Sequence, residues 1–196
     1  MKILIARHGQ TLFNLENKLQ GRSNSNLTEL GQTQAIKLGQ YIATHEIKTV
    51  HLSPLQRVLD TFKLMNVNTA TNINITAKLS EVCYGSWEEM EIEKIKSSTE
   101  WTNRKNDKYS FNHAGSYKGI KGESYKDLFT RVKPLFEEIS IYENVFMMSH
   151  LGVMRCALIH YANIEPNKAM HTELKNNTIL EITLENGSFK VKKRSL

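Results

Sequence analysis

The chain has 196 residues, 40% of them hydrophobic and 23% charged, as in an ordinary globular protein. No segment reaches the roughly 18–20 apolar residues of a membrane helix, and the first apolar run is short and ends in Arg7 and His8, unlike a signal peptide. We therefore expect a cytoplasmic protein that does not bind membranes. The net charge of +6 favours an anionic ligand, but the lysines are scattered, without the basic blocks and interleaved aromatic residues of a nucleic-acid-binding protein.

Strands and helices are predicted to alternate along a single domain of residues 1–196, without repeats or Pro/Gly linkers. Strands are expected at 2–6, 49–52, 73–77 and 145–149, with a closing hairpin at 178–184 and 189–193 around Asn186-Gly187. Helices are expected at 28–44, at 54–65 with Ser53 as N-cap, and at 123–139 and 151–161. Residues 91–121 are typical of a short helix and a long surface loop. This alternation predicts a largely parallel sheet covered on both faces.

Basic and ionisable residues stand where the predicted strands end. Arg7 and His8 follow the first strand, Arg57 lies in the first turn after the second, and His150 follows the strand at 145–149. Ligands of open α/β sheets bind beyond the carboxyl ends of the strands. A cation in the first turn of a helix opposes the helix dipole, and an anion bound beside Arg57 would reverse that penalty. These positions predict an anion site at one edge of the sheet.

The residue types at this edge suit phosphoryl transfer. A neutral imidazole, such as that of His8, attacks phosphorus and forms a phosphoramidate. The equatorial oxygens of the transferred group are bound bidentately by arginines. Arg7, Arg57 and a protonated His150 would therefore supply the positive field without a metal. Glu81, just after the strand at 73–77, is the best-placed carboxylate to protonate the leaving oxygen.

Several motifs follow one another along almost the whole chain. They are Arg7-His8-Gly9 with Asn14, LTELGQTQA at 27–35, HLSPLQR at 51–57 with Thr61, Leu79-Ser80-Glu81 with GSWE at 85–88, Gly122-Glu123-Ser124 with Arg131, Ser149-His150, and Asn176-Asn177-Thr178. This ordered series resembles the histidine phosphatase superfamily (phosphoglycerate mutase-like, branch 1). The sequence departs from the family pattern at Asn24, where aspartate is frequent, and at Glu89 and Leu151, where glycine is frequent.

The resemblance implies a three-layer α/β/α sandwich with a mostly parallel central sheet and a phosphohistidine formed at His8, with no metal and no cofactor. The implied catalytic residues are His8, Glu81, Arg7, Arg57 and His150. The implied substrate- and phosphate-binding residues are Asn14, Gly9, Gln10, Thr11, Gln20, Gly21 and Leu151.

The segment between the general acid and the later helix bears on the reaction type. The cofactor-dependent mutases of this superfamily carry a longer insertion there, rich in arginine and tyrosine, whereas residues 88–121 are short and contain Arg104 as their only arginine. This favours hydrolysis over isomerisation. The cations of this segment either line an entrance for a phosphorylated substrate or form a solvated surface; they are Lys94, Lys96, Arg104, Lys105, Lys108, Lys118 and Lys121.

Competing chemistries lack their motifs. A cysteine phosphatase needs Cys-x₅-Arg, but the residue after the five intervening positions is Glu89 for Cys83 and Ala162 for Cys156. No phosphate-binding loop of the Gly-x₄-Gly-Lys-Ser/Thr type and no His-Glu-x-x-His or His-x₃-His zinc motif occurs. We therefore expect a metal-independent phosphomonoesterase acting on a small phosphorylated metabolite. The alternatives are a phosphoglycerate mutase, a phosphoprotein phosphatase, and a catalytically silent phosphate-binding regulatory protein of the same fold.

Overall fold

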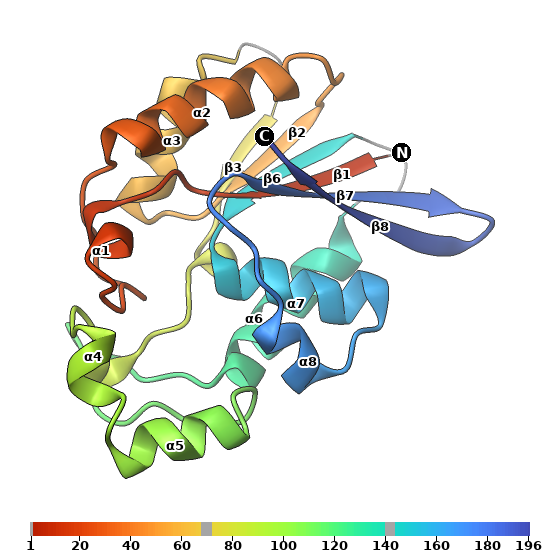
Figure 1. Cartoon of the computed structure of the whole chain (residues 1–196). Helices are drawn as coiled ribbons and strands as arrows, with labels where there is room; N and C mark the ends of the chain where they lie inside the picture. Colours follow the sequence, from red (N-terminus) through yellow and green to blue (C-terminus); the bar gives the residue numbers. More distant parts are fainter. Residues whose placement is uncertain (1, 68–71, 140–143) are drawn as a thin grey trace.

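The computed structural model describes residues 2–67, 72–139 and 144–196, and its centre is a six-stranded sheet (Figure 1). The strand order is β3 (Asn72–Ile75), β2 (Thr49–Leu52), β6 (Val145–Ser149), β1 (Lys2–Arg7), β7 (Thr178–Glu185) and β8 (Ser188–Ser195). Neighbours from β3 to β1 are parallel, and the β1–β7 and β7–β8 pairs are antiparallel. The predicted mostly parallel sheet is confirmed.

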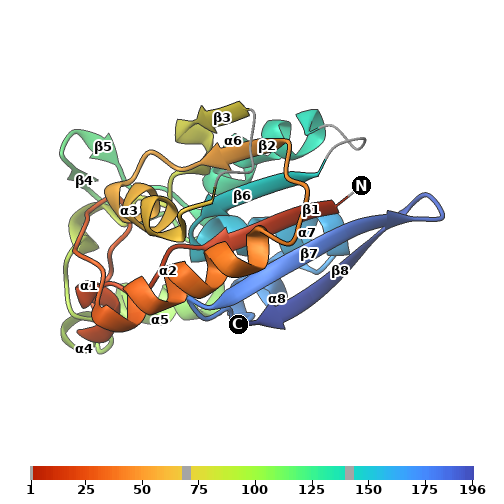
Figure 2. The same cartoon turned by 90° about the horizontal axis from the view of Figure 1, so that it is seen from above.

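Helices cover both faces of this sheet, which makes the predicted three-layer sandwich (Figures 1 and 2). Helices α2 (Glu29–Ile42) and α3 (Gln56–Met65) pack on one face, and α6 (Tyr125–Glu138), α7 (Leu151–Ala162) and α8 (Pro166–His171) on the other. Successive residues of a strand point to opposite faces. In β1, Leu4 and Ala6 accordingly join the core under α2 and α3, whereas Ile3 and Ile5 join the larger core under α6 and α7.

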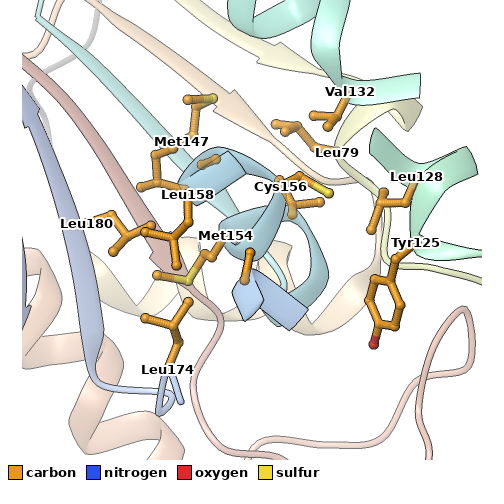
Figure 3. Close-up of a cluster of buried hydrophobic side chains, with 14 of the residues drawn as sticks. Leu79, Tyr125, Leu128, Val132, Met147, Met154, Cys156, Leu158, Leu174 and Leu180 are labelled. Carbon is orange, nitrogen blue, oxygen red and sulfur yellow. The ribbon is translucent and has the colours of Figure 1, made fainter. Parts of the chain in front are cut away.

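Helix α7 is the centre of the larger core. It is buried on nearly all sides because it packs between the sheet and α6. Figure 3 shows its residues Met154, Cys156 and Leu158 among side chains from the sheet, such as Met147 of β6 and Leu180 of β7. This packing fixes the start of α7 at the edge of the sheet where β1 and β6 end.

The structure corrects two local predictions. Helix α3 begins at Gln56 with Leu55 as its N-cap, because the Ser53 hydroxyl lies 2.7 Å from a ring nitrogen of His150 rather than capping the helix. Residues 91–121 hold more structure than a short helix and a loop. They form α4 (Ile92–Ile95), α5 (Thr99–Asn106) and a small hairpin of β4 (Ser116–Tyr117) and β5 (Ile120–Lys121).

Short elements complete the chain. Helix α1 (Leu12–Leu15) follows β1, and two 3₁₀ turns, η1 (Ala77–Leu79) and η2 (Gly85–Trp87), flank the segment of Glu81. The predicted hairpin turn is confirmed: Asn186 and Gly187 both have positive φ, at 51° and 74°, which suits the tight turn between β7 and β8.

Candidate active site

A cavity of about 310 Å³ opens where β1 ends. Its lining combines Arg7 and His8 from the end of β1, Arg57 from α3, Glu81 from the segment after η1, and Leu151 at the start of α7. The expected meeting of these groups at one edge of the sheet is therefore what the fold produces. The remaining lining residues come from loops and short helices: Gln10, Asn14, Asn17, Lys18, Leu19, Gln20, Gly21, Tyr84, Ile92 and Asn176.

His8 is buried and held in one tautomer. Its backbone N–H donates to the Ser149 carbonyl at 3.1 Å, which continues the pairing of β1 with β6. The ring Nδ1 lies 2.8 Å from the Gly9 carbonyl oxygen, which can only accept, so Nδ1 carries the proton. The lone pair of Nε2 then faces the Arg57 Nε–H, which donates to it at 3.1 Å. Burial, together with Arg57 and Arg7, holds the pKa of His8 well below its ordinary value. His8 is thus neutral at pH 7, as a nucleophile must be.

Arg57 is the most enclosed cation of the site, with 1% of its surface exposed. Its Nη1 donates to the Ser23 carbonyl at 2.6 Å and to Asn24 Oδ1 at 3.1 Å, and its Nη2 donates to the Gly21 carbonyl at 2.7 Å. Those oxygens offset the unfavourable position of a cation in the first turn of α3. Asn24, where the family often has aspartate, still accepts from this guanidinium.

His150 lies behind Arg57 rather than in the cavity wall and is fully buried. Its Nδ1 is 3.0 Å from Arg57 Nη2, which can only donate, so Nδ1 accepts and Nε2 carries the proton toward the Ser53 hydroxyl. Burial and the neighbouring Arg57 lower the pKa of His150 well below its ordinary value. The expected protonated His150 is therefore wrong for this structure. A neutral imidazole stands there because Arg57 supplies the positive charge.

The carboxylate of Glu81 meets the start of α7. Its Oε2 accepts from the backbone N–H of Gly152 at 3.0 Å, and its Oε1 accepts from the N–H of Val82 at 2.9 Å. Gly152 is required for this approach, since a Cβ built there would lie 2.2 Å from Glu81 Oε1. The carboxylate and His8 line the same cavity. A ligand in this cavity would therefore have both an imidazole and a carboxylate in its surroundings.

The Arg7 guanidinium has an N–H group without an acceptor in the described part of the chain. This group is the buried Nε–H, and the Nη1 is 3.4 Å from the Leu174 carbonyl oxygen. An unpaired buried donor on a cation is costly, and an oxyanion in the cavity would satisfy it. Nearby, the Asn176 amide donates to the His8 carbonyl at 2.9 Å and to Asn14 Oδ1 at 3.3 Å. These amides fix the backbone at His8.

Most of the residues expected to bind substrate line the cavity, but two do not. The N–H of Gly9 donates to the Thr61 hydroxyl at 3.0 Å, and Thr11 caps α1 and donates to Gln20 Oε1 at 3.0 Å. Both support the loop after β1 rather than facing the cavity. Asn176 was recognisable only as part of a closing-strand motif. The remaining additions, Asn17, Lys18, Leu19, Tyr84 and Ile92, lie on loops and a short helix and carry no sequence signal.

A second cavity of about 510 Å³ adjoins the first and shares Arg7, Gln10, Leu151 and Asn176 with it. Arg155 of α7 lines it, as does Glu173, whose carboxylate is 3.9 Å from Lys175 Nζ.

Arg155 belongs to a group of cations with Arg104 and Lys108. Burial, Arg155 and Arg104 together lower the pKa of Lys108 to about 7. The Arg104 guanidinium lies 6.0 Å from the ring of Tyr84, a residue of the catalytic cavity. None of these three cations forms an ion pair with a carboxylate in the part of the chain that the structure describes. Of the cations expected to line an entrance, only Arg104 and Lys108 are withdrawn from solvent; the others are exposed.

Two features are absent among residues 2–67, 72–139 and 144–196. No group of three or more His, Cys, Asp or Glu side chains is placed to hold a metal ion. No helix there has the length and apolarity needed to cross a membrane.

The chain is an α/β protein whose cavity lies at the carboxyl ends of parallel strands, where open sheets bind their ligands. The profile of the histidine phosphatase superfamily (branch 1) matches residues 3–196, so the chain belongs to that family. It is 29% identical over 185 residues to human 6-phosphofructo-2-kinase/fructose-2,6-bisphosphatase 4 and 30% identical over 184 residues to fructose-2,6-bisphosphatase of Saccharomyces cerevisiae. These matches cover 92% of this chain but only 37% and 38% of the relatives.

The fold has close counterparts among solved structures. A putative α-ribazole-5′-P phosphatase from Escherichia coli superposes with a TM-score of 0.85 at 19% identity, covering 100% of this chain and 96% of that one. At this identity the match concerns the fold alone.

Proposed function

We propose that this chain is a metal-independent phosphomonoesterase that forms a phosphohistidine at His8. The observation that carries the proposal is the tautomer of His8: the Gly9 carbonyl holds the proton on Nδ1, so Nε2 is unprotonated and its lone pair accepts from Arg57 in the absence of substrate. Membership of a phosphatase superfamily and relatives named as bisphosphatases support the same reaction class.

In the first step, Nε2 of His8 attacks phosphorus, the N–P bond forms, and the bond to the leaving oxygen breaks. Protonated Glu81 gives its proton to that oxygen, which departs as an alcohol. In the second step, Glu81 takes a proton from water, the resulting hydroxide oxygen bonds to phosphorus, and the N–P electrons return to His8. Arg7 and Arg57 stabilise the charge on the transferred group throughout.

Arg57 has a second part in the first step. Its Nε–H occupies the lone pair of His8 Nε2, so the nucleophile is released only when a phosphoryl oxygen takes over that N–H. The Arg57 guanidinium, which lowers the basicity of His8 in the free protein, then stabilises the negative charge of the bound phosphoryl group. A bound phosphoryl group also favours protonation of His150, because its negative charge lies beside Arg57.

The substrate of this phosphatase carries a second anionic group. The cations Arg104, Lys108 and Arg155 gather beside the catalytic cavity without carboxylate partners in the described residues, and an anion bound near them would relieve the repulsion that lowers the pKa of Lys108. The fructose-2,6-bisphosphatases among the relatives have, by their name, a substrate with two phosphates. A small sugar bisphosphate fits both features, and a phosphoglycerate, with its carboxylate, is the substrate of the mutase alternative.

The test of the reaction is hydrolysis of p-nitrophenyl phosphate in excess EDTA by the wild type and by His8→Ala. We expect turnover that survives EDTA and is lost in the variant. With ³²P-labelled substrate, an acid-labile, base-stable phosphoramidate should be trapped on the wild-type protein only. Metal-independent turnover that persists in His8→Ala contradicts the covalent route. A folded wild type without turnover favours the silent binding protein, and transfer of label between phosphoglycerates favours the mutase.

The test of the second anion is Lys108→Met against the matched control Lys105→Met, an exposed neighbour. With fructose 2,6-bisphosphate we expect KM to rise about tenfold or more in Lys108→Met, and p-nitrophenyl phosphate to be hydrolysed normally by both variants. The same KM should rise above pH 7 in the wild type, because Lys108, whose pKa is lowered to about 7, loses its charge there. An unchanged KM for the bisphosphate contradicts this assignment.

A further inference from the structure

Glu88 is a buried carboxylate without a place in the reaction described above. It belongs to the GSWE motif, is 7% exposed, and forms no ion pair in the described part of the chain. Both of its oxygens accept backbone N–H groups only. Oε1 accepts from Tyr84 at 2.8 Å and from Arg22 at 3.0 Å, and Oε2 accepts from Arg22 and Ser23 at 3.0 Å. Burying a carboxylate is costly, so such a complete set of donors indicates a specific task.

The loop that Glu88 holds is the one that encloses Arg57. The N–H groups of Arg22 and Ser23 point to Glu88, while the carbonyls of Gly21 and Ser23 point to the guanidinium at 2.7 and 2.6 Å. Gly21 has a φ of 44°, and a Cβ there would lie 2.0 Å from Glu88 Oε1. The loop is therefore clamped between the carboxylate on one side and the arginine on the other.

The Glu88 carboxylate also holds the chain segment that carries Glu81. Its bond to the Tyr84 N–H fixes a segment that begins three residues earlier with Glu81. Glu88 thus joins the segment of the proton donor to the loop that holds Arg57, and Arg57 in turn contacts His8. No other side chain in the described residues accepts backbone hydrogen bonds from both segments. Glu123 accepts from the Cys83 N–H, but its bond to Arg22 comes from the guanidinium.

We propose that Glu88 is a positioning residue: it holds the loop of residues 21–23 so that the Arg57 guanidinium stays against Nε2 of His8. The inference deepens the proposed function, since that contact holds the guanidinium at the place where the transferred phosphoryl group takes over its N–H. The Arg57 contact is also one reason why His8 stays neutral. The charged and titratable groups around His8 are Arg57, Arg7, His150 with its ring centre at 5.3 Å, and Glu81, which lines the same cavity. Of these, only Arg57 is fixed by the loop that Glu88 holds.

The test is Glu88→Gln with Glu89→Gln as the matched control. A glutamine at position 88 must turn its NH₂ toward a backbone N–H, because both oxygens of Glu88 are acceptors, and this repulsion displaces the loop. Glu89 is exposed, and its side chain accepts from the Tyr117 hydroxyl at 2.7 Å. The primary readout is the titration of the His8 ring by NMR, assigned with His8→Gln, because it requires no turnover.

We expect the midpoint of the His8 titration to rise by about one pH unit or more in Glu88→Gln and to stay at the wild-type value in Glu89→Gln. The acid limb of kcat/KM for p-nitrophenyl phosphate should move in parallel, with kcat lowered about 10–100-fold. A folded Glu88→Gln with the wild-type titration overturns the proposal, even if its activity is low, since that would be a merely structural effect. If Glu88→Gln does not fold, Gly21→Ala must show the same rise. A shifted titration in an enzyme without turnover would refute the proposed function but not the positioning.

Discussion

Replacement of Gly152 by alanine should displace the carboxylate of Glu81, the proposed proton donor, although Glu81 itself is not mutated. A Cβ at this position lies 2.2 Å from Glu81 Oε1, 2.8 Å from Leu128 Cδ2 and 3.0 Å from Tyr125 Cε1. Leu128 and Tyr125 are buried in the larger core (Figure 3), so the carboxylate is the group that has to move. It then loses the charge-assisted hydrogen bond from the Gly152 N–H, worth about 1.5–3 kcal/mol.

The kinetic effect should depend on the leaving group. A general acid contributes about 10²–10⁴-fold when the leaving oxygen needs a proton. We expect Gly152→Ala to lower kcat/KM about 100-fold or more for an alkyl phosphate such as glycerol 3-phosphate. For p-nitrophenyl phosphate the loss should stay below about tenfold, because nitrophenolate departs without full protonation. The ratio kcat/KM is the right quantity, since it reports the phosphorylation of His8 and not the later attack of water.

The assay compares both substrates for the wild type, Gly152→Ala and Glu81→Gln. The two variants should share one pattern, with urea unfolding showing that Gly152→Ala remains folded despite an overpacking cost of about 1–3 kcal/mol. Equal losses on alkyl and aryl phosphates in both variants would refute the role of Glu81 as acid. A leaving-group effect in Glu81→Gln alone would refute the steric argument at Gly152.

Two further predictions concern buried polar groups. Burial lowers the pKa of His113 to about 4, so the unfolded chain, with a pKa near 6.5, takes up the proton first as the pH falls. The contribution of neutral His113 to the free energy of unfolding is therefore complete above about pH 6.5, and about 3 kcal/mol of it is lost as the pH falls to 4. Urea unfolding at pH 7.5 and 4.5 should show a smaller loss of stability in His113→Gln than in the wild type. Equal losses in the two proteins would contradict this prediction. Asn176→Ala, which removes the donor to the His8 carbonyl, should lower kcat/KM for p-nitrophenyl phosphate about 3–10-fold while Asn177→Ala does not, and an unaffected Asn176→Ala would exclude that support.

Much of the frame was predictable from local patterns. The apolar run of β1, the helical spacing after Thr28 and the pair Asn186-Gly187 depend on neighbours in the chain, and the structure has the corresponding elements. The placement of His8 at a strand end and of Arg57 at a helix start was visible for the same reason. Parallel strands then bring such ends to one edge of the sheet, so the meeting of these residues followed from topology alone.

The states of these groups were decided by tertiary contacts. The sequence suggested a protonated His150, but its partner Arg57 lies 93 positions away in the chain, and full burial beside that cation keeps the ring neutral. The local sequence predicted Ser53 as a helix cap, but in the folded chain its hydroxyl contacts the ring of His150.

The same limit applies to the cations around the cavity. Arg155 comes from a distant part of the chain, whereas Arg104 and Lys108 are neighbours, and nothing in their spacing distinguished Lys108 from the exposed Lys105. Local periodicity selects elements because it acts between residues a few positions apart. Desolvation and hydrogen-bond partnership depend on which distant segments share a volume, and the folded chain alone determines that.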